Sequence, residues 1–318
     1  MNILEKESKL LDLEKEITKL GDSNSVQKLI EEVERYKLIE MTKLSAWDRV
    51  LLARHQKRPK AMDFIRYLAP DFIELHGDRL YGDDLSIVGG IGTIEGNIFT
   101  IIAQQKGSST EENISRNFAM SHPEGYRKAL RLMKQAEKFN RPILTIIDTP
   151  GAYPGIGAEE RGQGQAIAAN LFEMSNLTVP IIAVVIGEGG SGGALALGFA
   201  NKVLMLENSI YSILSPEGYA SIIWKDASRA EEASEVMKLT AFDLKDFQII
   251  DDIIKEPLGG AHFDKIKTFE ETKKVILVNY NNLRRLSRTE LQYQRNSKVR
   301  NFGFLQRFNY EHLGGIIK

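Results

Sequence analysis

Two glycine-rich segments carry the residues most suited to chemistry in this sequence. The first runs from Asp148 to Gly157, and the second from Gly187 to Ala194. Glycine lets a backbone turn tightly and lets a ligand approach main-chain N–H groups without a Cβ in the way. The first N–H groups of a helix lack partners within the helix and favour negative charge. Each segment could therefore bind a phosphate or stabilise an oxyanion formed during a reaction.

Each glycine segment follows an apolar run that predicts a buried strand, at 143–148 and at 181–187. A helix is expected at about 159–176 after the first segment, and a short helix directly after the second. Adjacent strands of an open α/β sheet bind ligands at their carboxyl ends, so the two segments are expected to lie together. The alternative stays open that the glycines only allow strands and helices to pack closely.

The remaining chain also alternates strands with helices. Strands are expected at 87–94 and 98–105, joined by a turn at 96–97, and a helix at 124–139. Further strands are expected at 202–206 and 210–214, with helices dominating after Pro216. This order predicts an α/β fold whose sheet is buried on both faces.

Residues 2–58 are predicted to be helical. Ile3, Leu10 and Ile17 repeat every seven residues, and Leu13 and Leu20 fill the second seam position. The pattern breaks at 21–24, and Ser25 is expected to cap a second helix. The second helix is expected to bury Val26, Leu29, Ile30 and Val33. We interpret this region as a helical hairpin that serves as a stabilising arm or subunit contact.

The composition excludes several classes of function. A net charge of -1 over 318 residues lacks the basic excess typical of nucleic-acid-binding proteins. The absence of cysteine excludes disulfides, cysteine-ligated zinc and a thiol nucleophile in this chain. The charged N-terminus is unlike a signal peptide, and no run approaches the roughly 18 apolar residues of a membrane span. We therefore expect a cytoplasmic protein without nucleic-acid or membrane partners.

Side chains offer little other chemistry. The five histidines show no metal-ligand spacing, and neither an H-E-x-x-H helix nor a G-x-S-x-G elbow is expected. Asp148 is expected to bond to the backbone of its own loop. Backbone amides therefore dominate, which suits stabilisation of an oxyanion better than general-base catalysis. Four cations near strand ends could meet phosphates, although a solvated surface role is preferred: Lys106, Arg116, Lys128 and Arg131.

A dinucleotide-binding interpretation competes with this one. Gly187, Gly189 and Gly192 satisfy G-x-G-x-x-G, and Glu207 lies twenty residues beyond the first glycine. The motif lies deep in the chain, however, and only about ten residues separate it from the next strand. The first glycine segment also has no role in dinucleotide binding. We therefore disfavour this function.

Residues 147–163 and 186–198 resemble the alpha subunit of bacterial acetyl-CoA carboxylase carboxyltransferases. The resemblance continues in order through further blocks at 46–59, 74–84, 122–142, 215–228 and 256–262. It implies an α/β, crotonase-like (ClpP/crotonase) fold, a spiral of ββα units with an N-terminal helical hairpin. The expected divisions are an N-terminal helical arm at 1–60, a carboxyltransferase domain at 61–265 and a C-terminal helical extension at 266–318.

The resemblance implies transfer of a carboxyl group from carboxybiotin to acetyl-CoA, which gives malonyl-CoA for fatty acid synthesis. It implies an oxyanion hole built from the amides of Gly151, Ala152, Gly192 and Gly193, which we assign to biotin. A Gly193→Val substitution is expected to direct a side chain toward the anion. The neighbouring residues expected to bind substrate are Tyr153, Pro154, Gly155, Gly189, Gly190 and Ser191.

The resemblance also implies partners. Activity is expected only with a beta subunit, which carries a four-cysteine zinc ribbon, in an α2β2 assembly. Biotin carboxylase and the biotin carboxyl carrier protein complete the expected system, and this chain itself is expected to hold no metal or cofactor. Two other functions stay open: a crotonase-type hydratase or thioesterase acting alone, and a non-catalytic scaffold with degenerate glycine segments.

Overall fold

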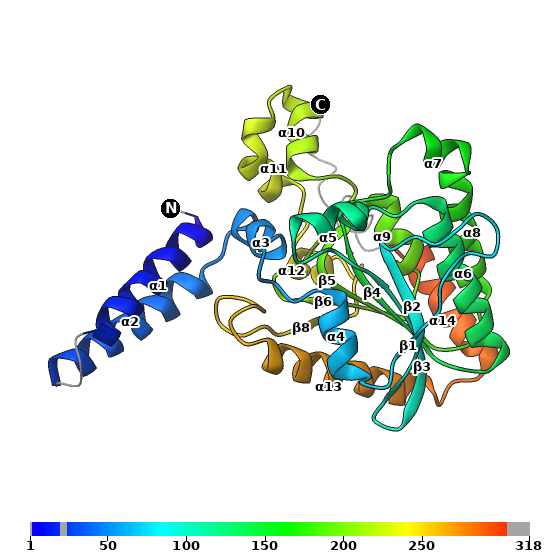
Figure 1. Ribbon diagram of the computed structural model, residues 1–318, viewed down its shortest axis with the longest axis horizontal. Helices are drawn as coiled ribbons and strands as arrows, with labels where there is room; N and C mark the ends of the chain where they lie inside the picture. Colours follow the sequence, from blue (N-terminus) through cyan, green and yellow to red (C-terminus); the bar gives the residue numbers. More distant parts are fainter. Residues whose placement is uncertain (1, 20–23, 304–318) are drawn as a thin grey trace, which may run out of the picture.

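The computed structural model describes residues 2–19 and 24–303, which form one α/β domain with a projecting helical hairpin (Figure 1). The sheet has the strand order β1-β2-β3-β4-β5-β6-β8, and β7 pairs with β5. The strands β1 to β3 are antiparallel, and the pairs from β3 to β8 are parallel. The strands are β1 (Ile73–Glu74), β2 (Ile87–Ile94), β3 (Asn97–Gln104), β4 (Ile143–Thr149), β5 (Ile181–Gly190), β6 (Lys202–Leu206), β7 (Ile210–Ser212) and β8 (Asp252–Ile254). The α/β prediction is confirmed.

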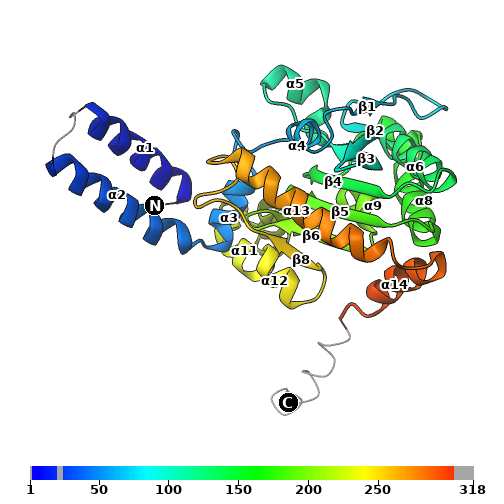
Figure 2. The same ribbon diagram turned by 90° about the horizontal axis from the view of Figure 1, so that it is seen from below.

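Helices cover both faces of this sheet (Figure 2). On one face α6 (Pro123–Lys138) and α8 (Gln163–Asn176) pack over the central strands. On the other face α4 (Ala61–Leu68) and α13 (Lys265–Leu283) contribute to a second core. Successive strand side chains point to opposite faces, so neighbouring apolar residues of β3 enter different cores. Burial on both faces explains why the central strands are almost continuously apolar.

The hairpin consists of α1 (Ile3–Lys19) and α2 (Asn24–Thr42), and it stands away from the sheet in both views. Ile3 and Leu10 are buried as expected, against the start of the domain. Leu13, Leu29 and Ile30 are exposed, which corrects the predicted seam. Two helices alone can cover only one stripe of each other, and no other described helix or strand lies beside the outer part of the hairpin in Figures 1 and 2.

Other boundaries also differ from the prediction. The second helix begins at Asn24, so Ser25 lies within its first turn, and Leu20 falls outside the described residues. The helix expected at 159–176 is divided into α7 (Ile156–Glu160) and α8, because Gly162 adopts a φ of +81°.

Several helices begin where the sequence supplies a capping side chain. Ser45 caps α3 (Ala46–Ala53) and Thr240 caps α12 (Ala241–Asp246), each in a capping box with an aspartate. Ser287 caps α14 (Arg288–Arg300) together with a glutamate. Three further helices are α5 (Thr110–Ser115), α10 (Pro216–Trp224) and α11 (Ala230–Val236). Within the described ranges, no helix is both long and apolar enough to cross a membrane.

Candidate active site

The two glycine segments meet at the carboxyl edge of the sheet, because β4 and β5 are parallel neighbours. The first segment leaves β4 at Thr149, and the second leads from β5 into α9 (Ser191–Gly198). A Cβ on Gly190 would lie 2.1 Å from the carbonyl oxygen of Pro150. The segments thus pack backbone against backbone. The prediction that they lie together is confirmed, and close packing is one reason for the glycines.

Backbone N–H groups are available where the segments touch. The N–H of Gly151 donates to Thr149 Oγ1 at 3.1 Å, so it is already engaged. The N–H of Ala152, by contrast, has no acceptor among the described residues. Gly192 and Gly193 lie in the first turn of α9, whose N-cap residue supplies no side-chain cap. The site therefore offers N–H donors from a loop and from a helix N-terminus.

Gly193 and Gly192 differ in their surroundings. A Cβ on Gly193 would lie 2.6 Å from the Ala152 nitrogen, whereas one on Gly192 would lie 3.7 Å from the Ile167 side chain. In Gly193→Val the side chain would therefore strike the first segment at the Ala152 amide. Whether it also points toward a bound anion stays a prediction. A small side chain fits at Gly192 without displacing the backbone.

Residues Gly189–Gly193 do fit the pattern G-x-S-x-G, so the expectation that no such pattern exists is wrong. Ser191 has a φ of +48° at the turn from β5 to α9, a strained conformation typical of a nucleophile elbow. No described residue forms a hydrogen bond with the Ser191 side chain. No described side chain is thus bonded to this hydroxyl as a base would be in a catalytic triad. The sharp turn instead presents the first turn of α9.

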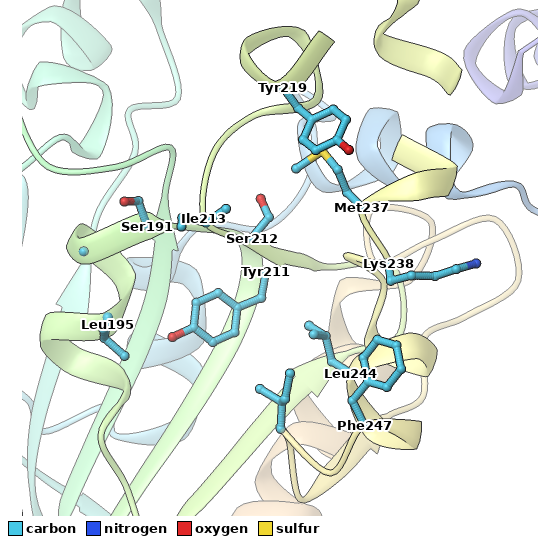
Figure 3. Close-up of a pocket in the computed structure, with 12 residues that line it drawn as sticks. Ser191, Leu195, Tyr211, Ser212, Ile213, Tyr219, Met237, Lys238, Leu244 and Phe247 are labelled. Atoms are coloured by element: carbon cyan, nitrogen blue, oxygen red, sulfur yellow. The ribbon is translucent and has the colours of Figure 1, made fainter. Parts of the chain in front are cut away.

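An apolar cavity of about 630 Å³ opens beside Ser191 and Gly192 (Figure 3). Its other walls come from Leu195 on α9, Tyr211 on β7 and Tyr219 on α10. Burial raises the pKa of Tyr211 to about 12, so its hydroxyl stays neutral. Further walls come from residues 237–249, and the Lys238 side chain points away from the cavity. No local sequence pattern indicated this cavity, because its walls lie far apart along the chain.

Of the residues expected to bind substrate, some line the cavity and others contact only the rest of the protein. Ser191 lines the cavity, but Gly189 is paired within the sheet and Gly190 packs on the first segment. The Tyr153 ring stacks on His122 with ring centroids 4.1 Å apart, and its N–H donates to the Ser121 carbonyl. Pro154 and Gly155 follow Tyr153 toward α7, away from the cavity walls.

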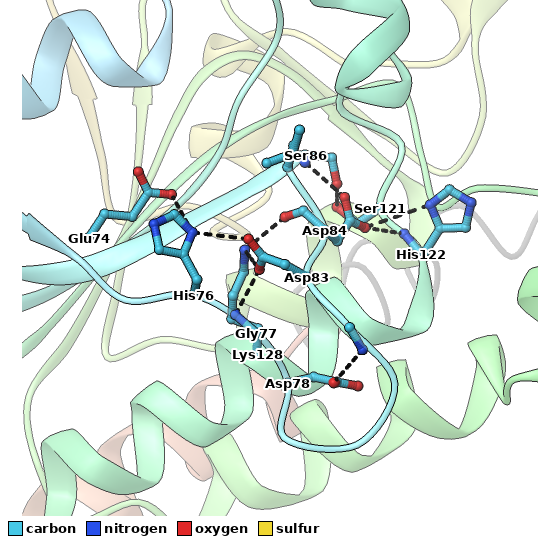
Figure 4. Close-up of polar contacts among 12 residues, drawn as sticks. Glu74, His76, Gly77, Asp78, Asp83, Asp84, Ser86, Ser121, His122 and Lys128 are labelled. Atoms are coloured by element: carbon cyan, nitrogen blue, oxygen red, sulfur yellow. Dashed lines mark hydrogen bonds and ion pairs between the residues drawn. The ribbon is translucent and has the colours of Figure 1, made fainter.

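The four candidate phosphate-binding cations are engaged within the protein. Lys128 Nζ contacts Asp83 Oδ1 at 2.5 Å and the carbonyl of Asp84 (Figure 4). Burial works to raise the pKa of Asp83, but the hydrogen bonds from Lys128, the Gly77 N–H and His76, with the charge of Lys128, together outweigh it and hold this pKa at about 2. The other three bond within the chain as well: Lys106 to Asp148 and Glu188, Arg116 to Glu112, and Arg131 to the Gly77 carbonyl.

The predicted roles of three residues are therefore wrong: those of Asp148, Lys106 and Lys128. The carboxylate of Asp148 accepts the N–H of Glu188 at 3.0 Å, so it bonds to the second segment and not to its own loop. Lys128 is fully buried and Lys106 nearly so, which excludes the preferred solvated role for both. Local sequence could not show this, because their partners come from other elements.

Two of the five histidines come together in three dimensions. His55 and His262 stack with ring centroids 3.9 Å apart, and Glu7 from α1 contacts both. The His55 Nδ1 accepts the N–H of Lys57, so its Nε2 carries the proton and faces Glu7. Lone pairs in two nearly parallel rings do not converge on one ion. This cluster therefore joins the hairpin to the domain through the hydrogen bond between His262 Nε2 and Glu7 Oε1.

The dinucleotide-binding interpretation does not fit the structure. Gly187 and Gly189 lie inside β5, so they do not form a phosphate-binding turn. Glu207 accepts the N–H of Glu256 and pairs with Lys255. The fold and site instead define an α/β protein in which two amide-bearing glycine segments meet beside an apolar cavity.

Solved structures share this fold. Transcarboxylase 12S with methylmalonyl-coenzyme A and methylmalonic acid bound superposes with a TM-score of 0.55 at 21% identity, over 70% of this chain and 44% of that one. The Pseudomonas malonate decarboxylase MdcD–MdcE hetero-dimer gives a TM-score of 0.60 at 15% identity, over 81% of this chain and 99% of that one. The predicted crotonase-like fold is thereby confirmed.

Sequence comparison shows the family. The model described as acetyl co-enzyme A carboxylase carboxyltransferase-like matches residues 2–303. The acetyl-coenzyme A carboxylase carboxyl transferase subunit alpha of Alkaliphilus oremlandii (strain OhILAs) is 56% identical over 311 residues, 95% of this chain and 98% of that protein. The same subunit of Staphylococcus aureus (strain JH9) is 58% identical over 262 residues, 82% of this chain and 83% of that protein. The chain belongs to this family of carboxyltransferase alpha subunits.

Proposed function

We propose that this chain supplies half of a carboxyltransferase active site. In this proposal the N–H groups of Ala152, Gly192 and Gly193 stabilise the ureido oxygen of biotin as its carboxyl group leaves. Gly151, also expected to donate, instead shapes the loop, because its N–H is engaged with Thr149 Oγ1. The observation that carries the proposal is the direct backbone contact between the two segments, the second of which lines an apolar cavity through Ser191 and Gly192. Each preorganised donor of this kind is typically worth about 10²–10³ in rate.

The surroundings favour biotin over coenzyme A on this side of the site. The bicyclic ring and valeryl chain of biotin are largely apolar, as are the walls formed by Leu195, Leu244 and Phe247. Coenzyme A carries phosphates that need free cations. The four cations near the strand ends already have partners within the chain, which supports placing the thioester in the partner subunit.

The chemistry then needs no side-chain base from this chain. The C–N bond of carboxybiotin breaks to release CO2, and the electron pair stays on the ureido group as an anion. That anion removes a proton from the methyl group of acetyl-CoA. The resulting enolate attacks CO2 and forms the new C–C bond of malonyl-CoA. Backbone donors stabilise the anion throughout because they are fixed before the reaction begins.

The proposed partners follow from the family. The name of its relatives, subunit alpha, supports assembly within a larger complex. We propose a beta subunit that carries a zinc ribbon and the second oxyanion hole, in an α2β2 core served by biotin carboxylase and the carrier protein. Carboxybiotin and acetyl-CoA are substrates in this scheme, and no cofactor is assigned to this chain. A cytoplasmic location stays a prediction from the sequence.

The test combines the purified chain with its beta partner, carboxylated biotin carrier and acetyl-CoA. We expect malonyl-CoA from the mixture and none from either subunit alone. Hydration of enoyl-CoA by the isolated chain would instead support a crotonase-type enzyme that acts alone. Failure of the complete mixture to form malonyl-CoA would overturn the proposal.

A further inference from the structure

The ammonium group of Lys106 bridges two carboxylates at the start of the two glycine segments. Lys106 Nζ lies 2.7 Å from Asp148 Oδ1 and 2.8 Å from Glu188 Oε2. Asp148 belongs to the end of β4, and Glu188 to the end of β5. The three side chains are at most 13% exposed, so solvent and salt screen their attraction weakly. One cation therefore joins the two strand ends from which the segments depart.

Lys106 and Glu188 stay charged around neutral pH. Burial works to lower the pKa of Lys106, but the charges of Asp148 and Glu188 outweigh it and raise this pKa. Burial works to raise the pKa of Glu188, but Lys106 and Arg54 hold it at about 2. Arg54 also binds Glu217 on α10, the helix that carries Tyr219 into the cavity wall. The bridge is thus a charge-assisted network, and it extends to the cavity.

The sheet itself does not hold the strand ends in register at this point. Ile147 pairs with Val185, but Thr149 pairs with Gly189, so the ladder shifts at Asp148. The Asp148 carboxylate fills the irregularity by accepting the N–H of Glu188 at 3.0 Å. It also lies where a Cβ on Gly187 would be, 2.4 Å from Asp148 Oδ1. Side chains therefore replace the regular ladder where the two segments begin.

A second side chain, two residues before Lys106 at the end of β3, bonds to the second glycine segment at Gly193. Gln104 ends β3 and is fully buried, and its Nε2 donates to the carbonyl oxygen of Gly193 at 2.8 Å. Gln105 continues the ladder through its N–H to the Ser86 carbonyl, so Gln104 and Lys106 project to the same face. The side chain of Gln105 is used elsewhere, as acceptor for the N–H of Met62.

We propose that Gln104 and Lys106 are positioning residues that fix the distance between the two amide-bearing segments. This inference rests on the proposed function of those segments as the anion-stabilising site. Neither side chain contacts the anion: Gln104 acts through Gly193, and Lys106 acts through Asp148 and Glu188. Donors placed for a transition state lose their effect when they shift, and a displacement of about 1 Å can cost about 10²-fold in rate.

The test uses the complete complex with the variants Lys106→Met, Lys106→Arg and Gln104→Leu. We expect Lys106→Met and Gln104→Leu to lower kcat by about 10–100-fold while the KM for acetyl-CoA changes less than about threefold. Lys106→Arg should recover much of kcat, because a guanidinium can bridge two carboxylates. The matched control is Lys298→Met on α14, far from the glycine segments. It likewise removes a lysine–carboxylate pair, in which Lys298 Nζ lies 2.8 Å from Asp251 Oδ2.

Hydrogen exchange supplies a second readout that does not need activity. Peptides covering 149–155 and 187–195 should exchange about tenfold faster in Lys106→Met, and unchanged in Lys298→Met. Unchanged exchange, an unaltered kcat, or an equal loss of kcat in Lys298→Met would overturn the inference. Should the wild-type complex form no malonyl-CoA, the proposed function fails, and exchange in the two peptides still decides whether Lys106 positions them.

Discussion

Gly193 lies directly against Ala152, such that a Cβ on Gly193 would stand 2.6 Å from the Ala152 amide nitrogen. This contact joins the loop after β4 to the first turn of α9, and it places the donors of both segments at one spot. No side-chain functional group takes part. Mutagenesis can therefore disturb these donors only by moving the backbone or by filling the space in front of them.

A methyl group at Gly193 should separate the two segments. Gly193→Ala forces its Cβ into the Ala152 backbone, so we expect kcat for malonyl-CoA formation to fall about 10²-fold. Thermal unfolding should report a loss of about 1–3 kcal/mol from overpacking. The control is Gly164→Ala on α8, where nothing lies within 4 Å of the added Cβ, and which should retain kcat. A wild-type kcat in Gly193→Ala would remove this contact from the mechanism.

Filling the cavity should affect one substrate and spare the other. Leu195 lines the cavity from α9, so Leu195→Phe reduces the space proposed for biotin. We expect the KM for the carboxylated carrier to rise at least about tenfold, with little change in the KM for acetyl-CoA. Leu258→Phe, in a separate cavity near Met41, is the control. An increase only in the KM for acetyl-CoA would assign the cavity to the thioester.

The junction between hairpin and domain should weaken in acid. Burial, together with the nearby His262, lowers the pKa of His55 from 6.5 to about 4. The unfolded state therefore binds more protons than the folded state between those pH values, and stability falls as pH falls through this window. Urea unfolding of the wild type at pH 7 and pH 5 should show the loss, and His55→Asn should reduce the difference. Equal pH dependence in both proteins would contradict this assignment.

The sequence predicted elements whose signals are local. The strands at 87–94 and 202–206 have the predicted bounds, because burial on both faces leaves a continuous apolar run. The meeting of the two glycine segments was also predictable, since parallel neighbours must end at the same sheet edge. Leu13 and Leu29 show the limit: heptad spacing indicates a seam, but it does not say whether a third element covers the rest of each helix.

Features that depend on contacts between distant parts of the chain could not be predicted from local sequence patterns. The partners of Lys106 come from two other strands, and its type alone indicates only a surface cation. His55 and His262 lie 207 positions apart and meet only because residues 256–263 fold back onto α3 and the hairpin. The cavity, too, forms only where residues far apart along the chain meet. Each of these required the fold before its chemistry could be recognised.

The buried pair between Arg58 and Glu256 should be a major determinant of stability. Arg58 binds both carboxylate oxygens, at 2.5 and 3.1 Å, and its Nε donates to the Ile186 carbonyl on β5. Both side chains are at most 1% exposed. Arg58→Met leaves the Glu256 charge buried without its partner, so we expect about 3–5 kcal/mol less stability in urea unfolding at pH 7.

The pH dependence distinguishes two causes of the lower stability of Arg58→Met: the unpaired charge of Glu256 and lost side-chain packing. Burial works to raise the pKa of Glu256, and Arg58 together with the hydrogen bonds from Asn208 outweighs it, so the single variant should raise this pKa. Its penalty should then be largest at neutral pH and decline as pH falls toward protonation of Glu256. Adding Glu256→Gln should recover part of the stability at pH 7. Lys134→Met, which breaks an exposed pair with Glu173, should cost under about 1 kcal/mol. If Arg58→Met costs no more stability than Lys134→Met, the buried pair contributes no more than a surface pair.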